Sequence, residues 1–383
     1  MSLDKPVALI FRTRLLPYSE TFIRTQADAM KTFRPFYVGV RDVHGLELPA
    51  ESVWVANRGG LTGLLKELRF TFLGPGRQCK ERLGALQPKL IHAHFGPDGA
   101  EAIPLMSALG IPLIVTFHGY DATLNDTALA KTSQGKRYLG KRSQLSRCGT
   151  RFLAVSNFIK SRIEQQGFPP DRIGVHYIGV DVVNFQPPAE RDAAMRVLFT
   201  GRLTEKKGCS YLIKAMAVVQ KELPGAELVV IGDGEERRAL EQLARSTLVS
   251  YRFLGRQSPS DVKQWMQKSS IFSVPSITAA SGDAEGFGIV FAEAQACGLP
   301  VVSFASGGIP EAVAHGETGM LAPERDWQKL AEYLLLLLQN REVWNRFSRA
   351  GRQRVECMFD VNKQTKMLED IYQRVSMEQQ PLP

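Results

Sequence analysis

The chain has 383 residues, 44% of them hydrophobic and 23% charged, a composition typical of a soluble globular protein. This length exceeds one compact core and predicts two domains of roughly 180 residues each. No apolar run approaches the ~20 residues that span a bilayer, and the first residues lack a signal-peptide pattern. Five widely spaced cysteines without a CxxC pair argue against a disulfide framework or a cysteine zinc site, so we expect a cytoplasmic location.

The net charge of +9 lies entirely in the first half of the chain. Residues 1–187 contain 24 Lys and Arg against 15 Asp and Glu, whereas the remainder has 24 of each. A basic stretch at 61–89 also carries leucine and phenylalanine side chains. It suits an interfacial helix on an anionic membrane or a surface that meets a phosphorylated substrate; a solvated basic face over a buried stripe fits equally well. No nucleic-acid motif accompanies the charge, so we expect no nucleic-acid partner.

Short β-branched runs alternate with helical patterns along the whole chain. In the first half we predict strands at 7–11, 36–40, 90–93, 113–117, 152–155 and 173–177. After residues 186–192 the pattern restarts, with strands predicted at 197–200, 228–231, 252–254, 271–274 and 301–304. Strand–helix alternation predicts parallel, doubly wound sheets, and the restart predicts two of them. Pro187-Pro188 is the expected linker.

Polar and glycine-containing motifs follow these predicted strands. They are His118 after 113–117, the loop 201–208 after 197–200, Gly232-Asp-Gly234 after 228–231, Gly255-Arg256 after 252–254, Glu285 after 271–274, and the loop 306–311 after 301–304. Ligands of open α/β sheets bind at the carboxyl ends of the strands. The sequence therefore predicts a single site between the two domains.

The segment 276–319 gives the most specific chemistry. A strand runs into a polar loop and then into a helix predicted to begin at about Phe287, beside Gly286 and Gly288. A helix N-terminus with glycines favours a nearby anion such as a phosphate. Glu285 and Glu293 bracket it, and we expect these carboxylates to accept hydrogen bonds from sugar hydroxyls. An ordinary strand–loop–helix with a capping Glu is the alternative.

The sequence offers little for a metal ion. No Asp-x-Asp occurs, and His92-Ala-His94 is the only close histidine pair. Two residues apart on a strand, the two rings share a face, but no third ligand lies nearer than Asp98. We therefore interpret the pair as structural and expect neither a metal nor a cofactor.

With these motifs in order, the chain resembles the retaining glycosyltransferases of family 4, which have the GT-B fold. The matching pieces are Gly201-Arg202 with Glu205-Lys-Lys-Gly208, Gly232-Asp-Gly234, Phe253-Leu-Gly255, Glu285-x7-Glu293, Gly307-Gly-Ile-Pro-Glu311, Gly316-Glu-Thr-Gly319 and His118-Gly119. Pro17-Tyr-Ser-Glu-Thr-Phe-Ile23 looks like the branch that serves bacterial exopolysaccharide and colanic-acid-type assembly. The chain lacks the Gly-Gly pair that many members carry in the first strand–helix loop.

The resemblance implies two Rossmann-like domains facing each other across a cleft. We expect an acceptor-binding domain at 1–187 and a nucleotide-sugar-binding domain at 188–360. A C-terminal helix at 361–383 is expected to cross back to the first domain. The implied reaction moves a hexose from a nucleotide-diphosphate sugar to a saccharide acceptor that is lipid-linked, and it retains the anomeric configuration without a metal.

The resemblance also implies roles for individual residues on the donor side. Arg202 and Lys207 should hold the diphosphate, and Glu293 should accept hydrogen bonds from the ribose. Glu285 should grip the hydroxyls of the donor sugar, together with the backbone N–H groups of Gly286, Phe287 and Gly288. Gly255 and Arg256 should meet the base through backbone groups.

On the other side of the reaction, His118 should lie near the anomeric centre. Asp121 is expected to orient His118 or an acceptor hydroxyl. The sequence offers no clear carboxylate nucleophile, and Asp121 is the one to test. Tyr18 and Ser19 are candidates for the acceptor, although Ser19 serves equally well as a helix cap.

Two other functions share the same motifs. A nucleotide-sugar epimerase has this architecture, and a non-catalytic nucleotide-sugar-binding assembly protein would need the same donor contacts. The basic first domain also predicts that a cytoplasmic enzyme could attach peripherally to the inner face of the membrane.

Overall fold

The computed structural model describes residues 5–192 and 194–377, which form two compact units. The N-terminal unit comprises residues 1–179 together with 361–383, and the C-terminal unit comprises residues 180–360. The division falls after Gly179 rather than at the expected 187, because Val180 already pairs with Asp360 in a parallel bridge of the second unit.

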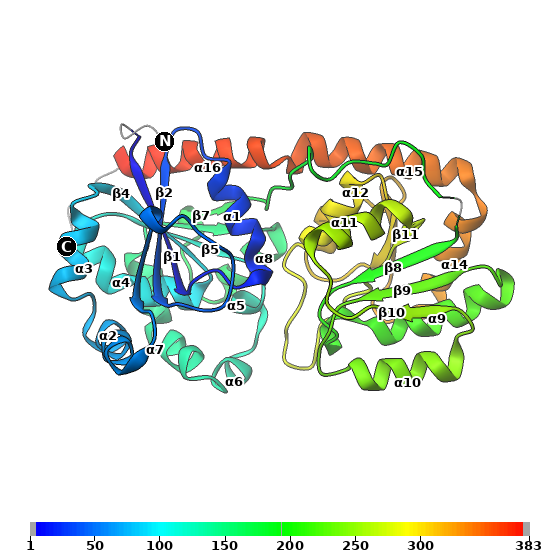
Figure 1. Cartoon of the computed structure of the whole chain (residues 1–383), viewed down its shortest axis with the longest axis horizontal. Helices are drawn as coiled ribbons and strands as arrows, with labels where there is room; N and C mark the ends of the chain where they lie inside the picture. The colour runs from blue at the N-terminus through cyan, green and yellow to red at the C-terminus, as the bar shows by residue number, and fades with distance from the viewer. Residues whose placement is uncertain (1–4, 193, 378–383) are drawn as a thin grey trace. The chain divides into compact units, whose positions relative to one another are not determined.

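The N-terminal unit is built on a seven-stranded parallel sheet in the order β3-β2-β1-β4-β5-β6-β7 (Figure 1). Its strands are β1 (Val7–Arg14), β2 (Arg34–Arg41), β3 (Val53–Asn57), β4 (Pro88–His94), β5 (Leu113–Phe117), β6 (Arg151–Ala154) and β7 (Ile173–Val175). The central strands are buried on both faces, as continuous Val, Ile, Leu and Phe runs require.

Helices connect these strands. They are α1 (Thr21–Asp28), α2 (Gly60–Leu73), α3 (Arg77–Gly84), α4 (Gly96–Leu109), α5 (Tyr120–Thr123), α6 (Asp126–Leu129), α7 (Ser133–Cys148), α8 (Asn157–Gln165) and the returning α16 (Val361–Met377). Short 3₁₀ turns occur at Tyr18–Glu20, Ala50–Ser52 and Pro170–Arg172.

The C-terminal unit repeats the design with six parallel strands in the order β10-β9-β8-β11-β12-β13. Its strands are β8 (Arg196–Thr200), β9 (Glu227–Ile231), β10 (Tyr251–Phe253), β11 (Ile271–Phe272), β12 (Val301–Phe304) and β13 (Gly319–Ala322). Its helices are α9 (Cys209–Glu222), α10 (Arg237–Thr247), α11 (Pro259–Lys268), α12 (Ile289–Ala296), α13 (Ile309–Ala312), α14 (Trp327–Gln339) and α15 (Arg341–Arg354), with a 3₁₀ turn at Glu205–Lys207 and a π turn at Val355–Phe359.

Two parallel sheets confirm the predicted fold class, but the sequence patterns missed two strands. β3 pairs only with β2 and β13 only with β12, so both are edge strands. Each is short, and β13 begins with a glycine in a segment interpreted as a motif. β7 and β10 are edge strands as well and both were predicted, so edge position alone does not explain the two omissions.

Helix α16 packs against the first unit through polar as well as apolar contacts. The Glu369 carboxylate accepts hydrogen bonds from the backbone N–H groups of Lys31, Thr32 and Phe33 at 2.6–2.9 Å. Tyr372 meets the Phe33 ring edge-on and bonds His92 on β4 at 2.6 Å. Helix α16 is thus part of the N-terminal core, and residues 378–383 of the expected helix 361–383 lie outside the described residues. In the part of the chain that the structure describes, no helix has the length and apolar character needed to cross a bilayer.

Replacing Glu369 by Ala should loosen this attachment, because three backbone donors lose one charged acceptor. We expect a loss of about 3 kcal/mol in local stability. The backbone N–H groups of residues 31–33 and of α16 should exchange faster in hydrogen-exchange mass spectrometry. The exposed neighbour Asp370→Ala is the matched control and should leave the exchange unchanged. Equal protection in both variants would contradict the assigned role of Glu369.

Candidate active site

The C-terminal unit places a largely buried ion pair at the carboxyl ends of its strands. Lys207 ends the 3₁₀ turn after β8, and its Nζ donates to Oε2 of Glu285 at 2.5 Å. The chain turns away at Gly208, whose φ of +63° lies in the left-handed region. A Cβ there would lie 1.9 Å from the carbonyl oxygen of Pro275, so only glycine allows this approach. The pair is therefore fixed by the backbone on both sides.

The charge of Glu285 is stabilised by its surroundings. Burial alone would raise its pKa, but the cations of Lys207 and Lys206 lower the pKa to about 2, helped by hydrogen bonds from Lys207 and Ser276. Lys206 in turn pairs with Asp283 at 3.0 Å. Two lysines and two carboxylates thus alternate in this loop cluster, and Glu285 is an acceptor at any physiological pH.

The backbone around Glu285 is also tied down. Its carbonyl oxygen accepts a hydrogen bond from Gly308 at 2.8 Å, which joins the loop before α12 to the loop after β12. Helix α12 begins at Ile289, with Gly288 in a left-handed conformation before it, two residues later than predicted from Phe287. Because the Phe287 ring is buried and packs on Phe359, only backbone groups of Phe287 can meet a ligand.

Glu293 lies in α12 and has the opposite electrostatic environment. Burial raises its pKa to about 7, and no hydrogen bond or ion pair to its carboxylate is found among the described residues. A carboxylate of this kind gains free energy from any ligand that donates hydrogen bonds to it. Donor hydroxyls fit this requirement.

The other predicted donor residues lie in more open positions. Arg202 is exposed and makes no ion pair among the described residues, and the Arg256 guanidinium lies 3.9 Å from Asp233. Gly255 has a φ of +67°, and its carbonyl oxygen accepts from the backbone N–H of Gly232 at 2.9 Å. Arg202 is thus a free cation at the end of β8.

In the N-terminal unit, His118 follows β5 and pairs with a second histidine. Its Nε2 lies 3.0 Å from Nδ1 of His94 on β4, and burial lowers the pKa of both rings. Both rings are therefore neutral at pH 7, and one donates to the other. The Nδ1 of His118 is buried without a hydrogen-bond partner among the described residues. An orphaned ring nitrogen of this kind is suited to a ligand hydroxyl.

Asp121 is fully buried and acts on the backbone of this loop. Its carboxylate accepts hydrogen bonds from the N–H groups of Gly96, His118 and Gly119 at 2.8–3.1 Å. Burial raises the pKa of Asp121 to about 6, although the backbone hydrogen bonds act to lower it. Asp121 thus orients His118 through the main chain, and both of its oxygens are already occupied.

The two acceptor candidates lie on the surface. Tyr18 is exposed, and its hydroxyl is 3.3 Å from Nε2 of His44. Ser19 is exposed and does not cap a helix, since α1 has Glu20 at its N-cap and no side-chain cap bond. The capping alternative for Ser19 is therefore wrong, because the 3₁₀ turn moves the helix start one residue later.

A buried ionic cluster beside these residues was missed by the sequence analysis. Arg12 bonds Glu20 on one side and Asp98 on the other, donates to the carbonyl oxygen of His94 at 2.8 Å, and lies over the Phe95 ring. Burial raises the pKa of both carboxyl groups, and the Arg12 guanidinium between them acts in the opposite direction. The signal was an arginine directly after the apolar run 7–11, where a strand interior normally excludes charge.

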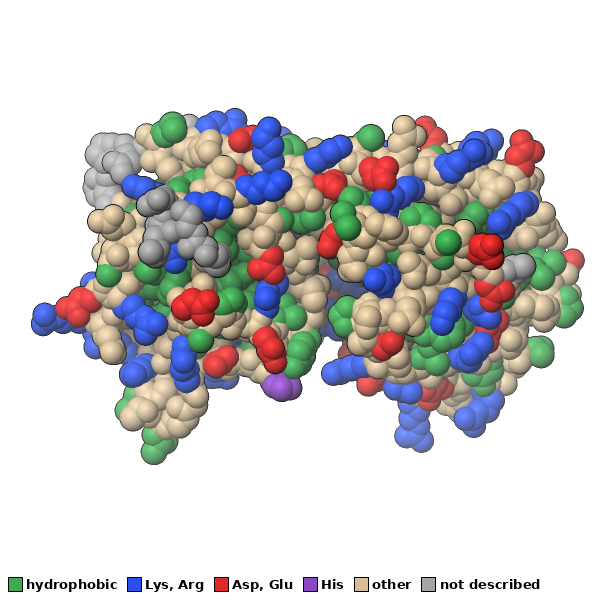
Figure 2. Space-filling view, turned by 45° about the horizontal axis from the view of Figure 1, so that its top comes forward, with side chains coloured by type: hydrophobic (Ala, Val, Ile, Leu, Met, Phe, Trp, Pro, Cys, Tyr) green, Lys and Arg blue, Asp and Glu red, His purple; other side chains and the backbone are tan. Residues whose placement is uncertain are grey.

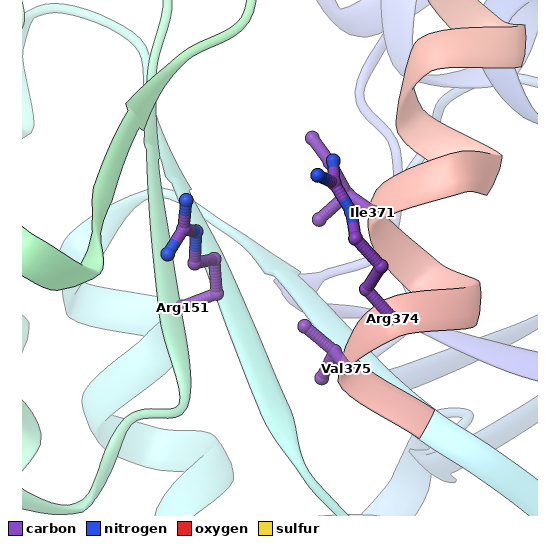
Figure 3. Close-up of a pocket in the computed structure, with 4 residues that line it drawn as sticks. All are labelled: Arg151, Ile371, Arg374 and Val375. Carbon is purple, nitrogen blue, oxygen red and sulfur yellow. The ribbon is translucent and has the colours of Figure 1, made fainter. Parts of the chain in front are cut away.

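The remaining groups have protein partners. His92 bonds Tyr372 and Thr116, which agrees with the structural interpretation of this histidine. A hollow in the N-terminal unit is lined by Arg151, Ile371, Arg374 and Val375 (Figure 3). Because Arg151 begins β6, this hollow lies toward the amino ends of the strands, opposite the edge at which ligands of such sheets bind.

Comparison with known proteins identifies the family. The sequence profile of "Glycosyltransferase Family 4" matches residues 20–184, and that of "Glycosyl transferases group 1" matches residues 183–354. The amylovoran biosynthesis glycosyltransferase AmsK of Erwinia amylovora is 31% identical over 74% of this chain and 69% of its own length. This chain is a family 4 glycosyltransferase.

Other relatives agree with this assignment. WcaL of Escherichia coli K12, which carries a provisional assignment to colanic acid biosynthesis, is 32% identical over 64% of this chain and 61% of its own length. Among solved structures, sucrose-phosphate synthase of Thermosynechococcus elongatus superimposes with a TM-score of 0.76 at 19% identity, covering 97% of this chain and 99% of the other. Anabaena HepE with UDP-glucose gives 0.75 at 19% identity, covering 96% and 99%. These likenesses confirm the GT-B fold.

Replacing Glu293 by Gln should stabilise the glycosyltransferase in a pH-dependent way. The folded pKa of about 7 lies above the usual value of 4.5, so the folded state loses stability as pH rises between these values. The variant avoids this loss. We expect a gain on the order of 1–3 kcal/mol at pH 8 and none below pH 5.

The measurement is urea unfolding followed by tryptophan fluorescence, since three of the four tryptophans (Trp265, Trp327, Trp344) lie in the C-terminal unit. Exposed Glu222→Gln is the control. A gain of the same size at pH 5 and pH 8 would contradict the raised pKa.

The His94–His118 bond predicts one fixed neutral tautomer for His118. ¹⁵N NMR of the histidine rings should show neutral His118 from pH 8 down to pH 5.5, because burial lowers its pKa. In His94→Phe the partner is lost, and we expect a mixture of tautomers. His118→Gln assigns the signals. A His118 signal that titrates near pH 6.5 in the wild-type chain would rule this arrangement out.

Proposed function

We propose that this glycosyltransferase moves a hexose from a nucleotide-diphosphate sugar to a hydroxyl of a lipid-linked saccharide, with retention at the anomeric carbon. The product would serve surface polysaccharide or glycolipid biosynthesis at the cytoplasmic face of the membrane. The observation that carries the proposal is the buried Lys207–Glu285 pair, a fixed cation beside a fixed carboxylate at the carboxyl ends of the strands. The cation suits the phosphate oxygens of a diphosphate, and the carboxylate suits the hydroxyls of a sugar.

The cations of the C-terminal unit suit the leaving diphosphate. A lysine ammonium has three N–H donors, and Glu285 uses one of those of Lys207, so others can bind phosphate oxygens. The exposed guanidinium of Arg202 supplies a second positive charge that no acid neutralises within the described residues. Both groups would stabilise the charge that builds on the nucleotide as the glycosidic bond breaks.

The two glutamates suit the two sugars of the donor. Glu285 is ionised and rigid, so it can accept hydrogen bonds from the hexose without reorganising. Glu293 has a raised pKa, and ribose hydroxyls that donate to it would lower that pKa again. We assign Glu285 to the transferred sugar and Glu293 to the ribose.

For the chemical step we favour attack from the face of the departing phosphate. The acceptor hydroxyl gives its proton to a phosphate oxygen as the anomeric carbon gains positive charge. His118 would bond a donor hydroxyl through its unpartnered Nδ1. A covalent intermediate on Asp121 is less suited to the geometry, because its oxygens already accept three backbone N–H groups.

Relatives support a lipid-borne acceptor. A Corynebacterium glutamicum protein that is 38% identical over 47% of this chain is a GDP-mannose-dependent mannosyltransferase acting on a monoacylated phosphatidylinositol monomannoside. AmsK belongs to amylovoran biosynthesis by its name. The first of these names states both an activated-sugar donor and a lipid acceptor, which is the reaction class proposed here.

A thermal-shift panel of UDP and GDP sugars tests the donor assignment. One donor should raise the melting temperature, since a ligand that binds the folded state stabilises it by mass action. Lys207→Ala should weaken that donor about 100-fold, a loss of about 3 kcal/mol for a charge-assisted contact. Exposed Lys221→Ala carries the same charge change on α9 and should bind normally.

A turnover assay tests the proposed reaction itself. With a lipid-linked saccharide the enzyme should release free nucleotide and form an α-linked product from an α-linked donor, with equal rates in EDTA. Glu285→Gln, which keeps the side-chain shape, should lose turnover by at least 100-fold. Equal binding of every nucleotide sugar by wild type and Lys207→Ala would sink the proposal.

A further inference from the structure

Helix α2 of the N-terminal unit packs against the sheet with a narrow side and leaves most of its large apolar side chains exposed. Its contacts with the sheet are made by Gly63, Glu67 and Phe70, which recur at helical spacing. Gly63 lies against the Asn57 side chain, Glu67 accepts hydrogen bonds from Arg41 and Asn57, and the Phe70 ring packs on Phe11. An ordinary surface helix has the reverse arrangement.

The opposite side of α2 is a row of large apolar side chains. The exposed fractions are 81% for Leu61, 43% for Leu64, 66% for Leu65, 45% for Leu68, 69% for Phe72 and 83% for Leu73. Six of the fourteen exposed large hydrophobic side chains of the described residues lie in this one helix. Positions 61, 65, 68 and 72 fall on one face. We call these six residues the α2 apolar stripe.

Unneutralised cations surround the stripe. Lys66 and Arg69 lie on α2 itself, Arg58 precedes it, and Lys80 and Arg82 lie on the following helix α3, all of them exposed. None of these five forms an ion pair within the described part of the chain. The two acids of the segment, Glu67 and Glu81, are already paired with Arg41 and Arg77. The surface is thus both apolar and strongly positive.

We propose that the α2 apolar stripe and its surrounding cations dock the enzyme on the surface of a bilayer that contains anionic phospholipids. This inference rests on the proposed function for its purpose, since a lipid-linked acceptor lies in that bilayer. Leucine and phenylalanine side chains would enter the boundary between headgroups and acyl chains, and the lysines and arginines would meet the phosphates. No described helix can span the membrane, so the attachment is interfacial.

Charge selects the bilayer over a second copy of the chain. A symmetric contact between two α2 stripes would bring two sets of the same five cations together, and like charges at an interface are repelled. An anionic bilayer instead offers hydrocarbon and distributed negative charge in one surface. The helix lies at the edge of its unit, outside the core (Figure 1), and basic side chains are widespread on the face of this unit shown in Figure 2. Such a patch needs a partner.

Flotation of the full chain with lipid vesicles tests the proposal. We expect binding to phosphatidylcholine vesicles that contain 30% phosphatidylglycerol, weak binding to pure phosphatidylcholine, and release by 0.5 M salt. Removing each positive charge should weaken binding to the anionic vesicles about fivefold. The double variant Lys66→Gln with Arg69→Gln should therefore weaken it about 25-fold. Leu65→Ser with Phe72→Ser should weaken it more than tenfold while keeping the charge.

The matched control removes two exposed lysines elsewhere in the same unit. Lys131→Gln with Lys136→Gln changes the net charge equally, at and near α7, and should alter binding less than twofold. An equal loss in this control would show general basic attraction and overturn the proposal. So would an unchanged affinity in the Leu65, Phe72 variant accompanied by loss of a dimer in sedimentation, which would assign the stripe to a second copy.

The two proposals fail separately. Variants of α2 should keep the thermal shift with the donor and should keep transfer to a detergent-dispersed acceptor, because none of these residues belongs to the donor or acceptor machinery. Vesicle binding without any response to nucleotide sugars would sink the proposed function alone. A normal donor response without vesicle binding would sink the docking proposal alone.

Discussion

The proposed chemistry of this glycosyltransferase rests on an ion pair that the fold largely removes from water. Taking Lys207 and Glu285 out of solvent costs free energy, and the cost is offset because each finds the other at 2.5 Å with Lys206 nearby. Gly208 permits the backbone approach that sets the position of Lys207. The outcome is a carboxylate with a low pKa and a cation with spare donors, held in place before any ligand arrives.

In the N-terminal unit, two of the buried polar groups are neutral histidine rings that hydrogen-bond each other. His94 bonds His118, and Asp121 holds the loop by its backbone. The Arg12 guanidinium donates to the carbonyl oxygen of His94, and its positive charge adds to the effect of burial in lowering the pKa of both rings. A neutral histidine with one unpartnered nitrogen is a hydrogen-bonding group, which fits the proposed contact of His118 with a hydroxyl better than a role as a cation.

Helix α2 exposes apolar side chains whose burial would stabilise the folded chain. Six apolar side chains stay in water although each would gain free energy from burial, and a glutamate takes the place against the sheet. Folding alone does not account for this pattern. The proposed contact with lipid would account for it, and the stripe lies in the unit to which the acceptor-binding role is assigned.

The sequence by itself determined the two parallel sheets and the loops that carry the motifs, because strand periodicity and glycine spacing are local properties. Strands β3 and β13 were not predicted, and β13 begins with a glycine in a segment that was interpreted as a motif. Only tertiary structure decided that Glu285 and Glu293, eight residues apart, have pKa values displaced in opposite directions. It also decided that His94 is the partner of His118 and that α2 faces outward. These facts depend on what packs around a side chain, and packing brings together residues that are distant in the sequence.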